Sequence, residues 1–486
     1  MRQILKEIKW NEYAIVLIIF LGAFVVRVAA LKAPMRYDES FTFLYYVSRG
    51  FTFIVTDYFR PNNHIFHSLL VWWSTLLLGI KPWAIRLPAF VAGLLSVIVT
   101  YWAGKTLFNK STAFVASIII AFSTTMITYS ANARGYSIVC LFTVLLIICA
   151  NWIRTNKPKS WVLFVLLGIF GLYTIPIMIY PLGSILMWIF LEKRMEAAKP
   201  LLLAIFSIIT ITFILYMPIF LTSGILYFIK IAGHKTWAAA GWSQLCIEIW
   251  KQWTINYPIW LQVLTFFGFV TGLILYKSSF KIPLVFPCLL FCVPVLIIQQ
   301  NLPPARTWLP FLPIFAITTA NGITRLSSFL FKKGSGVIVV FLAFIYISVA
   351  PLTVKSLKDP YLYDSEVLNE AAIFLKNELT NDDKLLLNNL IDLVVTYYLL
   401  LYDGPTENIV ATWAGNSIED ILNSKRIIMI LSRTPEEFGI VKLGSNFLKP
   451  QCLKKIADIN IYELTSIQEE NLPIYTGRRL LTLRVD

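Results

Sequence analysis

Charged residues are scarce in this chain. Only 14% of its 486 residues are charged, whereas 57% are hydrophobic. A soluble globular protein averages about 25% charged and about 45–50% apolar residues. The shortage of charge therefore excludes an ordinary soluble protein and indicates a chain that crosses a membrane several times. The first apolar segment, 13–31, is too long for the core of a cleavable signal peptide, so we expect it to remain as a span.

Cysteine patterns typical of metal and redox sites are also missing. The six cysteines include no Cys-x-x-Cys pair, and most of them lie in apolar segments. We interpret them as small apolar residues within helices, although a bridge between Cys246 and Cys452 stays open.

The charge that is present is strongly unbalanced. The chain has 42 Lys and Arg residues against 27 Asp and Glu residues, which gives a net charge of +15. The basic residues occupy short loops between apolar segments, and no RNA- or DNA-binding motif occurs. Basic loops next to spans mark the cytoplasmic side of a membrane. We therefore expect a multi-pass protein of the plasma (inner) membrane with a cytoplasmic N-terminus and no nucleic-acid partner.

About eleven apolar segments have the length and hydrophobicity of membrane spans. They are 13–31, 84–104, 111–130, 136–153, 160–175, 177–191, 200–218, 259–276, 282–298, 307–322 and 335–351. The segment 64–80 is also apolar, but as a span it would move the later basic loops to the side opposite the basic N-terminus. We expect it instead to be a juxtamembrane helix within a long first outer loop, 32–83.

The composition changes after Pro351. Residues 352–486 hold most of the acidic residues, and they alternate apolar runs, at 384–388 and 426–432, with a helical pattern at 365–379. This pattern predicts a small α/β domain. After an odd number of spans from a cytoplasmic N-terminus, it would lie outside. The predicted fold is thus an all-α polytopic membrane domain, 1–351, followed by an extracytoplasmic α/β domain, 352–486.

An acidic pair, Asp38 and Glu39, follows the first span directly. At the mouth of a span a carboxylate meets water and can accept a proton from a hydroxyl, which is the task of a general base. The alternative is structural, because Asp38 could cap a short helix whose N-terminus Glu39 then favours. Asp57, another acid of the first loop, is more simply a solvated residue.

Polar residues gather later in the first outer loop. Arg60, Asn63, His64 and His67 stand at the start of the predicted juxtamembrane helix, and the two histidines, three positions apart, share one helix face. Their spacing is not a zinc signature, so a hydrogen-bonding or phosphate-binding role is favoured over a metal. Packing at the membrane interface is the alternative.

Two arginines are predicted at the outer ends of later spans. Arg134 precedes Tyr136, and Arg306 precedes Trp308. A guanidinium there can hold a phosphate through paired hydrogen bonds, or it can anchor the chain at the interface together with its aromatic neighbour. A third arginine, Arg27, lies within the first span, one turn from its outer end. From there we expect it to extend to the membrane surface, in a mostly structural role.

The order of these motifs resembles the GT-C glycosyltransferases that use polyprenyl-phosphate sugars, such as the protein O-mannosyltransferases and the lipid A aminoarabinose transferase. The matching stretches are Tyr-Asp-Glu at 37–39, Pro-Asn-Asn-His at 61–64, Ala-Ile-Arg-Leu-Pro-Ala at 84–89, Asn-Ala-Arg-Gly-Tyr at 132–136 and Ala-Arg-Thr-Trp-Leu-Pro at 305–310. The resemblance is best over residues 30–140.

The resemblance implies an inverting enzyme that moves a hexosyl- or pentosyl-type sugar from an undecaprenyl- or dolichyl-type phosphate to an acceptor hydroxyl outside the cytoplasm. The acceptor would be a lipid, a glycan or a protein. Asp38 corresponds to the catalytic base with Glu39 beside it, and Arg134 and Arg306 correspond to groups that hold the donor phosphate. Relatives often carry an acid where this chain has Asn132, so a divalent metal ion stays open and no cofactor is assigned.

Two other classes of protein remain as alternatives. A lipid or polysaccharide transporter or flippase would line a central path with polar residues and would not need Asp38. A scaffolding membrane protein would depend on residues 352–486 and tolerate changes in the first loop.

Overall fold

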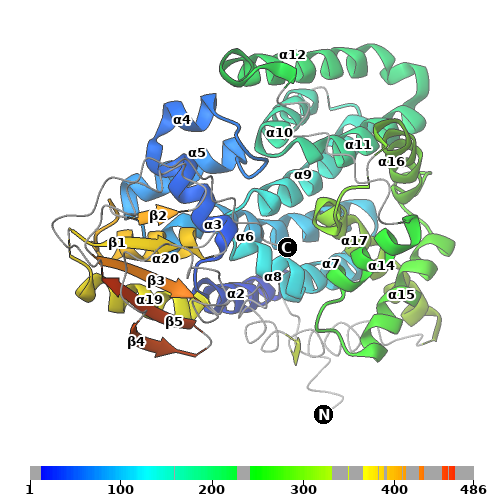
Figure 1. The fold of residues 1–486 in the computed structure, drawn as a ribbon. Coiled ribbons are helices and arrows are strands. Elements are labelled where there is room, and N and C mark those ends of the chain that lie inside the picture. The colour runs from blue at the N-terminus through cyan, green and yellow to red at the C-terminus, as the bar shows by residue number, and fades with distance from the viewer. Residues whose placement is uncertain are drawn as a thin grey trace. The chain divides into compact units, whose positions relative to one another are not determined.

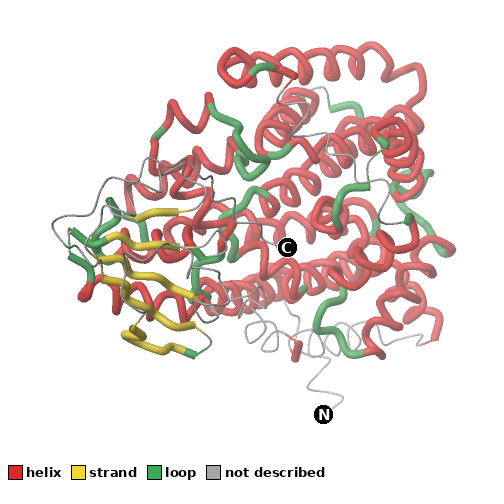
Figure 2. The backbone as a smooth tube through the Cα atoms, in the orientation of Figure 1, coloured by secondary structure: helices red, strands yellow, loops and turns green. Residues whose placement is uncertain are grey.

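The computed structural model describes most of the chain. The described residues are 12–157, 159–226, 241–300, 302–330, 348–349, 365–380, 382–387, 391–407, 409–411, 426–431, 451–457 and 459–465. The chain divides into two compact units, Met1–Asp359 and Pro360–Asp486. The described part of the first unit is helical, and the second unit contains a sheet (Figures 1 and 2).

The long helices of the first unit follow the apolar segments of the sequence. They are α2 (Glu12–Leu31), α6 (Pro82–Leu107), α7 (Lys110–Phe122), α8 (Thr124–Ser130), α9 (Tyr136–Arg154), α10 (Ser160–Thr174), α11 (Ile179–Lys193), α12 (Ala198–Ser223), α15 (Ile259–Ile274), α16 (Val285–Gln299) and α17 (Leu312–Leu330). The expected spans from 13–31 to 307–322 coincide with these helices, and 111–130 corresponds to α7 and α8 together. The last expected span, 335–351, falls outside the described residues except for 348–349.

The number of membrane crossings is only partly determined by these helices. Four of the described helical stretches are long and apolar enough to cross a membrane, or five if α7 and α8, which meet at a bend of 58°, form one span. Several other apolar helices are shorter, so the total of about eleven spans stays a prediction.

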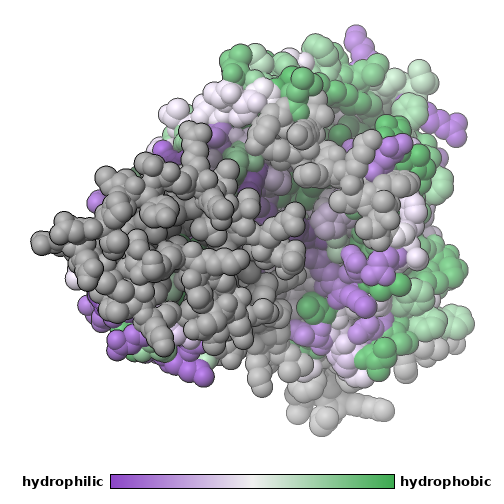
Figure 3. Space-filling model, viewed as in Figure 1, coloured by the Kyte–Doolittle hydropathy of each residue, from purple (hydrophilic) through white to green (hydrophobic). Residues whose placement is uncertain are grey.

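The helices at the periphery of the first unit expose apolar side chains. Leu202 and Phe206 on α12 and Phe267 on α15 are each more than half exposed. Hydrophobic side chains gather at the edge of the molecule over α12, α15 and α16 (Figure 3). In contrast, most side chains of α9 are buried. An apolar exterior around a buried helix is what a lipid environment favours.

The first loop forms a series of short helices. These are α3 (Tyr37–Phe41), the π-helix η1 (Thr42–Tyr46), η2 (Val47–Arg49), α4 (Phe51–Thr56) and α5 (Ile65–Leu78). Helix α5 has 14 residues, which gives a length of about 21 Å, less than the ~30 Å hydrocarbon core of a bilayer. A helix of this length fits the expected juxtamembrane element.

Arg27 does not extend to the surface, and the prediction that it would do so is wrong. Its side chain is fully buried and donates to Ala121 O at 2.6 Å, to Ile120 O at 3.1 Å and to Ser130 Oγ at 3.1 Å. The two carbonyl groups belong to the last turn of α7, which precedes the bend at Ser123. Buried charge inside a membrane protein is tolerated where it finds such acceptors. Arg27 therefore stabilises the break between α7 and α8.

The second unit contains a small sheet together with helices, which agrees with the α/β pattern of the sequence after Pro351. Its strands are β1 (Lys384–Leu387), β2 (Ile409–Ala411), β3 (Arg426–Leu431), β4 (Gln451–Ile456) and β5 (Ile459–Thr465), in the spatial order β2-β1-β3-β5-β4. Strand β1 is parallel to both of its neighbours, whereas β5 is antiparallel to β3 and β4. Helix α19 (Ser365–Glu378) packs against α20 (Asp392–Leu401).

The remaining described helices are short connecting elements. They are η3 (Pro176–Met178), η4 (Arg194–Ala197), α14 (Trp242–Trp253) and η5 (Ala305–Phe311).

Candidate active site

Glu39 is a buried structural residue. Its side chain is fully buried and accepts two hydrogen bonds from Arg86, at 2.8 and 2.6 Å. The same carboxylate accepts the backbone N–H of Ala133 at 2.7 Å and that of Arg36 at 3.0 Å. Although burial alone raises it, the positive charge of Arg86 holds the pKa of Glu39 below its usual value. The carboxylate is thus ionised and fully engaged, which leaves no position from which it could accept a substrate proton.

Asp38, in contrast to Glu39, is partly exposed. It is the second residue of α3, whose N-cap is Arg36, so the alternative that Asp38 caps this helix is wrong. Its side chain is 43% exposed. It forms an ion pair with Arg134 and accepts a hydrogen bond from Asn62 Nδ2 at 3.3 Å. The structure therefore separates the acidic pair into a buried residue and an accessible one.

Arg134 and His64 lie beside Asp38. Arg134 belongs to the turn between α8 and α9 and is 5% exposed. Its Nη2 donates to Asn62 Oδ1 at 3.1 Å and lies 3.5 Å from His64 Nε2. Within the described residues, its Nε has no hydrogen-bond partner.

The hydrogen bonding of His64 determines its tautomer. The backbone N–H of Gly135 donates to His64 Nδ1 at 2.8 Å, so Nδ1 carries no proton. In the neutral ring the proton is then on Nε2, which is the nitrogen next to Arg134. Two N–H donors that face each other at 3.5 Å cannot bond to one another, but they can share an acceptor such as a phosphate oxygen.

The electrostatic environment keeps His64 neutral. Burial, and then the positive charge of Arg134, lower the pKa of His64 well below its usual value of 6.5, and the nearby His67 and Arg306 act in the same direction. A proton on this ring would add positive charge to a group of cations. His64 is therefore an N–H donor in its neutral form throughout the physiological pH range.

Gly135 permits the turn before α9 to pack closely against His64 in the first loop and against Thr174 at the end of α10. A Cβ atom at this position would lie 2.4 Å from Thr174 Cγ2 and 3.3 Å from His64 Cβ. Only glycine fits such an approach, because real Cβ atoms essentially never come closer than 3.0 Å to another heavy atom. The Arg-Gly-Tyr sequence at 134–136 thus positions Arg134 against His64.

Tyr136 and Arg306 complete the surroundings of His64. The ring of Tyr136 packs edge-on against His64, with centroids 5.4 Å apart, and the Arg134 guanidinium lies 5.5 Å from its centroid. Arg306, at the start of η5, is exposed but near enough for its charge to act on His64. The structure therefore brings Asp38, His64, Arg134, Tyr136 and Arg306 to one region.

The other residues predicted in the first loop occupy supporting positions. Asn63 is buried and donates to the carbonyl groups of residues 54 and 57, at 2.8 and 2.9 Å. Arg60 is exposed, with its guanidinium 5.7 and 5.6 Å from the rings of Phe41 and Phe59. His67 is fully buried, and within the described residues neither ring nitrogen has a hydrogen-bond partner. Asn63 and Arg60 are therefore occupied in shaping the loop.

The donor set around Asp38 does not fit a divalent metal ion. No group of three His, Cys, Asp or Glu side chains suited to a metal occurs in the part of the chain that the structure describes. The side chain of Asn132 is a neutral amide, and Arg134 already forms an ion pair with Asp38. A cation here would meet the guanidinium, so no step is assigned to a metal.

Two residues that matter here were not predicted as site residues, although both lie in the motifs quoted above. Asn62 bonds to both Asp38 and Arg134, and Arg86 anchors Glu39. Arg86 had a recognisable signal. A charge near the start of an apolar helix needs a buried partner, and Glu39 is an acid in the preceding loop.

Comparison with known proteins supports the resemblance seen in the sequence. Residues 61–221, less than half of the chain, match the family model of dolichyl-phosphate-mannose-protein mannosyltransferase. No curated protein sequence matches the chain significantly.

Solved structures show where this fold occurs. ArnT from Cupriavidus metallidurans is 12% identical in its apo state, with a TM-score of 0.63, and 92% of this chain and 97% of that chain are covered. The same protein bound to undecaprenyl phosphate gives a TM-score of 0.64 at 11% identity over the same shares of both chains. The oligosaccharyltransferase AglB from Archaeoglobus fulgidus, in complex with an inhibitory peptide and a dolichol-phosphate, gives 0.53 at 11% identity, covering 87% of this chain and 69% of that one. At these identities the likeness establishes the GT-C fold.

Proposed function

We propose that this protein is a membrane glycosyltransferase that moves a sugar from a polyprenyl-phosphate carrier to an acceptor hydroxyl on the extracytoplasmic face. The observation that carries the proposal is the geometry around Asp38. An accessible carboxylate lies next to a buried arginine and a neutral histidine whose N–H groups converge without bonding to each other. One side of this site can accept a proton, and the other can hold an anion.

The residues fit the steps of a direct displacement. Asp38 would take the proton of the acceptor hydroxyl as its oxygen bonds to the anomeric carbon of the sugar. The bond from that carbon to the carrier phosphate would break, and its electron pair would leave with the phosphate oxygen. Arg134, His64 and Arg306 would stabilise the charge that grows on this phosphate. A single displacement inverts the anomeric configuration.

Different observations support the proposed carrier lipid and the proposed side of the membrane. Solved proteins with this fold bind undecaprenyl phosphate or dolichol-phosphate, and the matching family model is described by dolichyl-phosphate-mannose. The basic loops favour a cytoplasmic N-terminus, so that Asp38 after the first span, and the α/β unit after an odd number of spans, would lie outside; the proposed location is the plasma (inner) membrane. The acceptor is proposed only as a lipid, glycan or protein hydroxyl.

The test compares two acids of the first loop. Membranes containing the full chain would be supplied with undecaprenyl-phosphate hexoses and pentoses, and released undecaprenyl phosphate would be measured. Asp38→Asn should abolish release while the folded protein remains. Asp57→Asn should retain it, because an amide can still accept the N–H of Phe59, which lies 2.9 Å from Asp57 Oδ1. Near-normal turnover by Asp38→Asn would contradict the proposal, and lipid flux without sugar release would favour a flippase.

A further inference from the structure

A cavity with polar and charged lining residues lies at the end of the helical unit away from Asp38. It has a volume of about 240 Å³, and its lining includes Asn156, Lys157, Trp161, Lys193, Glu196 and Pro200. Helix α9 begins at Tyr136, beside the candidate active site, and ends just before Asn156 after 19 residues. A helix of this length spans about 28 Å, so the cavity and the active site lie at opposite ends of α9.

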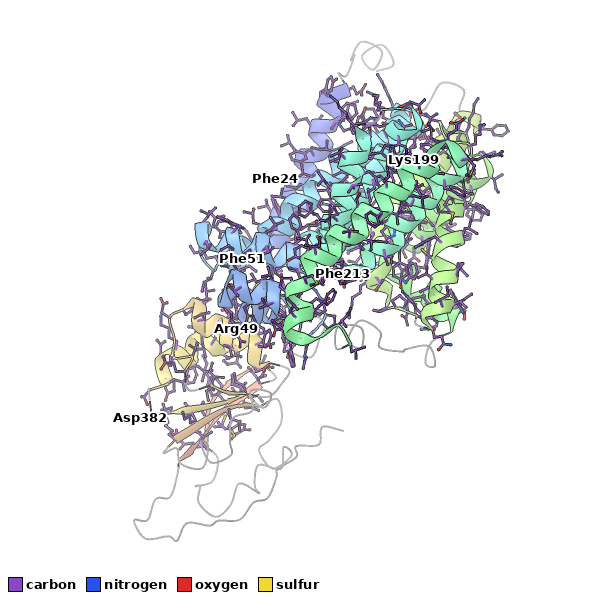
Figure 4. All side chains as sticks on the ribbon, turned by 90° about the horizontal axis from the view of Figure 1, so that it is seen from above. Phe24, Arg49, Phe51, Lys199, Phe213 and Asp382 are labelled. Atoms are coloured by element: carbon purple, nitrogen blue, oxygen red, sulfur yellow. The ribbon has the colours of Figure 1, made fainter. Side chains whose placement is uncertain are left out.

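The position of this cavity agrees with the arrangement of the basic loops. Lys199, at the start of α12, lies at the opposite end of the helical unit from Arg49 of the first loop (Figure 4). The cavity lies between the loop from α9 to α10 and the segment from α11 to α12. These are two of the loops whose charge marks the cytoplasmic face.

The charge around the cavity is predominantly positive. Its lining contributes Lys157 and Lys193 against Glu196. The two loops together carry Arg154, Lys157, Lys159, Lys193, Arg194 and Lys199 against Glu192 and Glu196. An anion that enters the cavity would thus meet two ammonium groups within an excess of positive charge.

The lysines approach the cavity from two different elements. Lys193, in the last turn of α11, donates a hydrogen bond to Asn156 Oδ1 across the cavity. Asn156 adopts a left-handed backbone conformation with φ 58°, which asparagine tolerates well. An ammonium group has three N–H donors, and this bond uses one of them. The contact therefore directs Lys193 towards the cavity and leaves donors for a bound anion.

The rest of the lining is apolar. Trp161 and Pro200 line the cavity together with the side chain of Ile153. Tryptophan is enriched at the level of lipid headgroups, where one side of the ring meets water and the other meets hydrocarbon. A site with cationic groups beside an apolar wall suits a phosphate that is attached to a glycerol and acyl chains, whereas a free inorganic anion would leave the wall unused.

We propose that this cavity binds the phosphate headgroup of an acidic membrane lipid on the cytoplasmic face. The site is separate from the proposed transfer reaction and does not depend on it. Glu196 limits its affinity, because its carboxylate repels the anion. The volume greatly exceeds the ~10–15 Å³ that a single water needs, so the cavity has room for a headgroup as well as solvent.

The experiment uses the full chain purified with lipid and measures bound phosphatidylglycerol by native mass spectrometry. Lys157→Gln and Lys193→Gln should each weaken binding about fivefold, and Glu196→Gln should strengthen it. Lys277→Gln with Lys281→Gln is the matched control, since these lysines belong to another basic loop outside the cavity lining. Thermal unfolding in neutral lipid would show that all variants remain folded.

Each outcome decides for or against the proposal. Weaker lipid binding by Lys157→Gln and Lys193→Gln, together with stronger lipid binding by Glu196→Gln, supports the proposal. An equal loss of lipid binding in the Lys277 and Lys281 control would show that acidic lipid is attracted to any basic loop, and it would overturn the proposal. Displacement of the lipid by millimolar inorganic phosphate would assign the cavity to a soluble anion and also overturn it. Unchanged lipid binding in both Lys157→Gln and Lys193→Gln would do the same.

Discussion

Glu39 and Arg86 form an ion pair in which both side chains are fully buried and Oε2 lies 2.6 Å from Nη2. Arg86 also donates to the carbonyl groups of residues 31, 33 and 34, and Glu39 accepts the N–H of Ala133. The pair therefore joins the end of α2, the first loop, α6 and the turn before α9. Asp38 adjoins Glu39 in the sequence, and Arg134 adjoins Ala133. The buried ion pair therefore holds Asp38 and Arg134 at a fixed distance from each other.

Breaking this pair should destabilise the protein strongly. Glu39→Gln leaves the Arg86 charge buried without a counter-charge, and the loss of one partner of a buried ion pair costs about 3–5 kcal/mol. We expect a clear fall in the thermal unfolding midpoint in detergent. Glu12→Gln is the control, because the ion pairs of Glu12 with Lys105 and Lys110 are more exposed and should matter much less. Equal midpoints for the two variants would argue against a central role for the buried pair.

The close packing of Gly135 against Thr174 and His64 predicts that a side chain at position 135 would displace Arg134 and reduce activity. In Gly135→Ala the new methyl group would overlap Thr174 Cγ2 and press on His64, so the turn that carries Arg134 must move. We expect sugar transfer to fall at least about tenfold, since a displacement of ~1 Å at a reacting site has effects of this size or larger.

A second substitution separates displacement from general damage. Thr174→Ser removes the methyl group that the alanine would meet, and it keeps the hydroxyl that donates to Phe170 O at 2.7 Å. Combined with Gly135→Ala, it should restore part of the activity. If the double variant is no more active than Gly135→Ala alone, the contact with Thr174 is not what places the turn.

The sequence predicts the elements of this fold better than it predicts their contacts. Long apolar segments give α2, α6 and α9, and the change in composition gives the α/β unit, because both are local properties of the chain. The different roles of Asp38 and Glu39 are not local. They depend on Arg86, which lies 47 residues beyond Glu39. Only the folded chain shows which of the two neighbouring acids is buried.

Arg27 is a second residue whose buried contacts the sequence does not reveal. Its place near the end of a span suggests that it extends to the surface, since a lone charge in lipid is unfavourable. The acceptors that keep it buried are carbonyl groups at the end of α7, about 90 residues away. Carbonyl groups left unpaired by a helix break have no signature in the sequence, so this contact could not be predicted.

Arg306 should affect the donor more than the acceptor. It is exposed and its charge acts on His64, which places it on the side of the site where the carrier phosphate would bind. Removing a charge-assisted hydrogen bond costs about 1.5–3 kcal/mol, so Arg306→Ala should raise the KM for the polyprenyl-phosphate sugar by roughly 10- to 100-fold. The KM for the acceptor should change little. Arg325→Ala, near the other end of α17, is the control, and an unchanged donor KM in Arg306→Ala would leave Arg306 as a membrane anchor.

His67 should make stability depend on pH. Burial, and then the charge of Arg134, lower the pKa of His67 to about 3, although Glu39 opposes this shift. In the unfolded chain the pKa of a histidine is about 6.5, so between these two values the unfolded state binds more protons than the folded state. Stability should therefore be complete above pH ~6.5 and fall as the pH decreases through this window.

Thermal unfolding should be measured between pH 7 and 5, where Asp and Glu side chains are largely ionised in both the folded and the unfolded state. A single such histidine contributes at most about 1.4 kcal/mol per pH unit. The unfolding midpoint of the native chain should decrease across this range, and His67→Gln should decrease less because glutamine cannot take up a proton. His64 shares the direction of the shift, so some dependence should remain in the variant. If His67→Gln and the native chain lose stability equally, the ring of His67 is not held neutral by its surroundings.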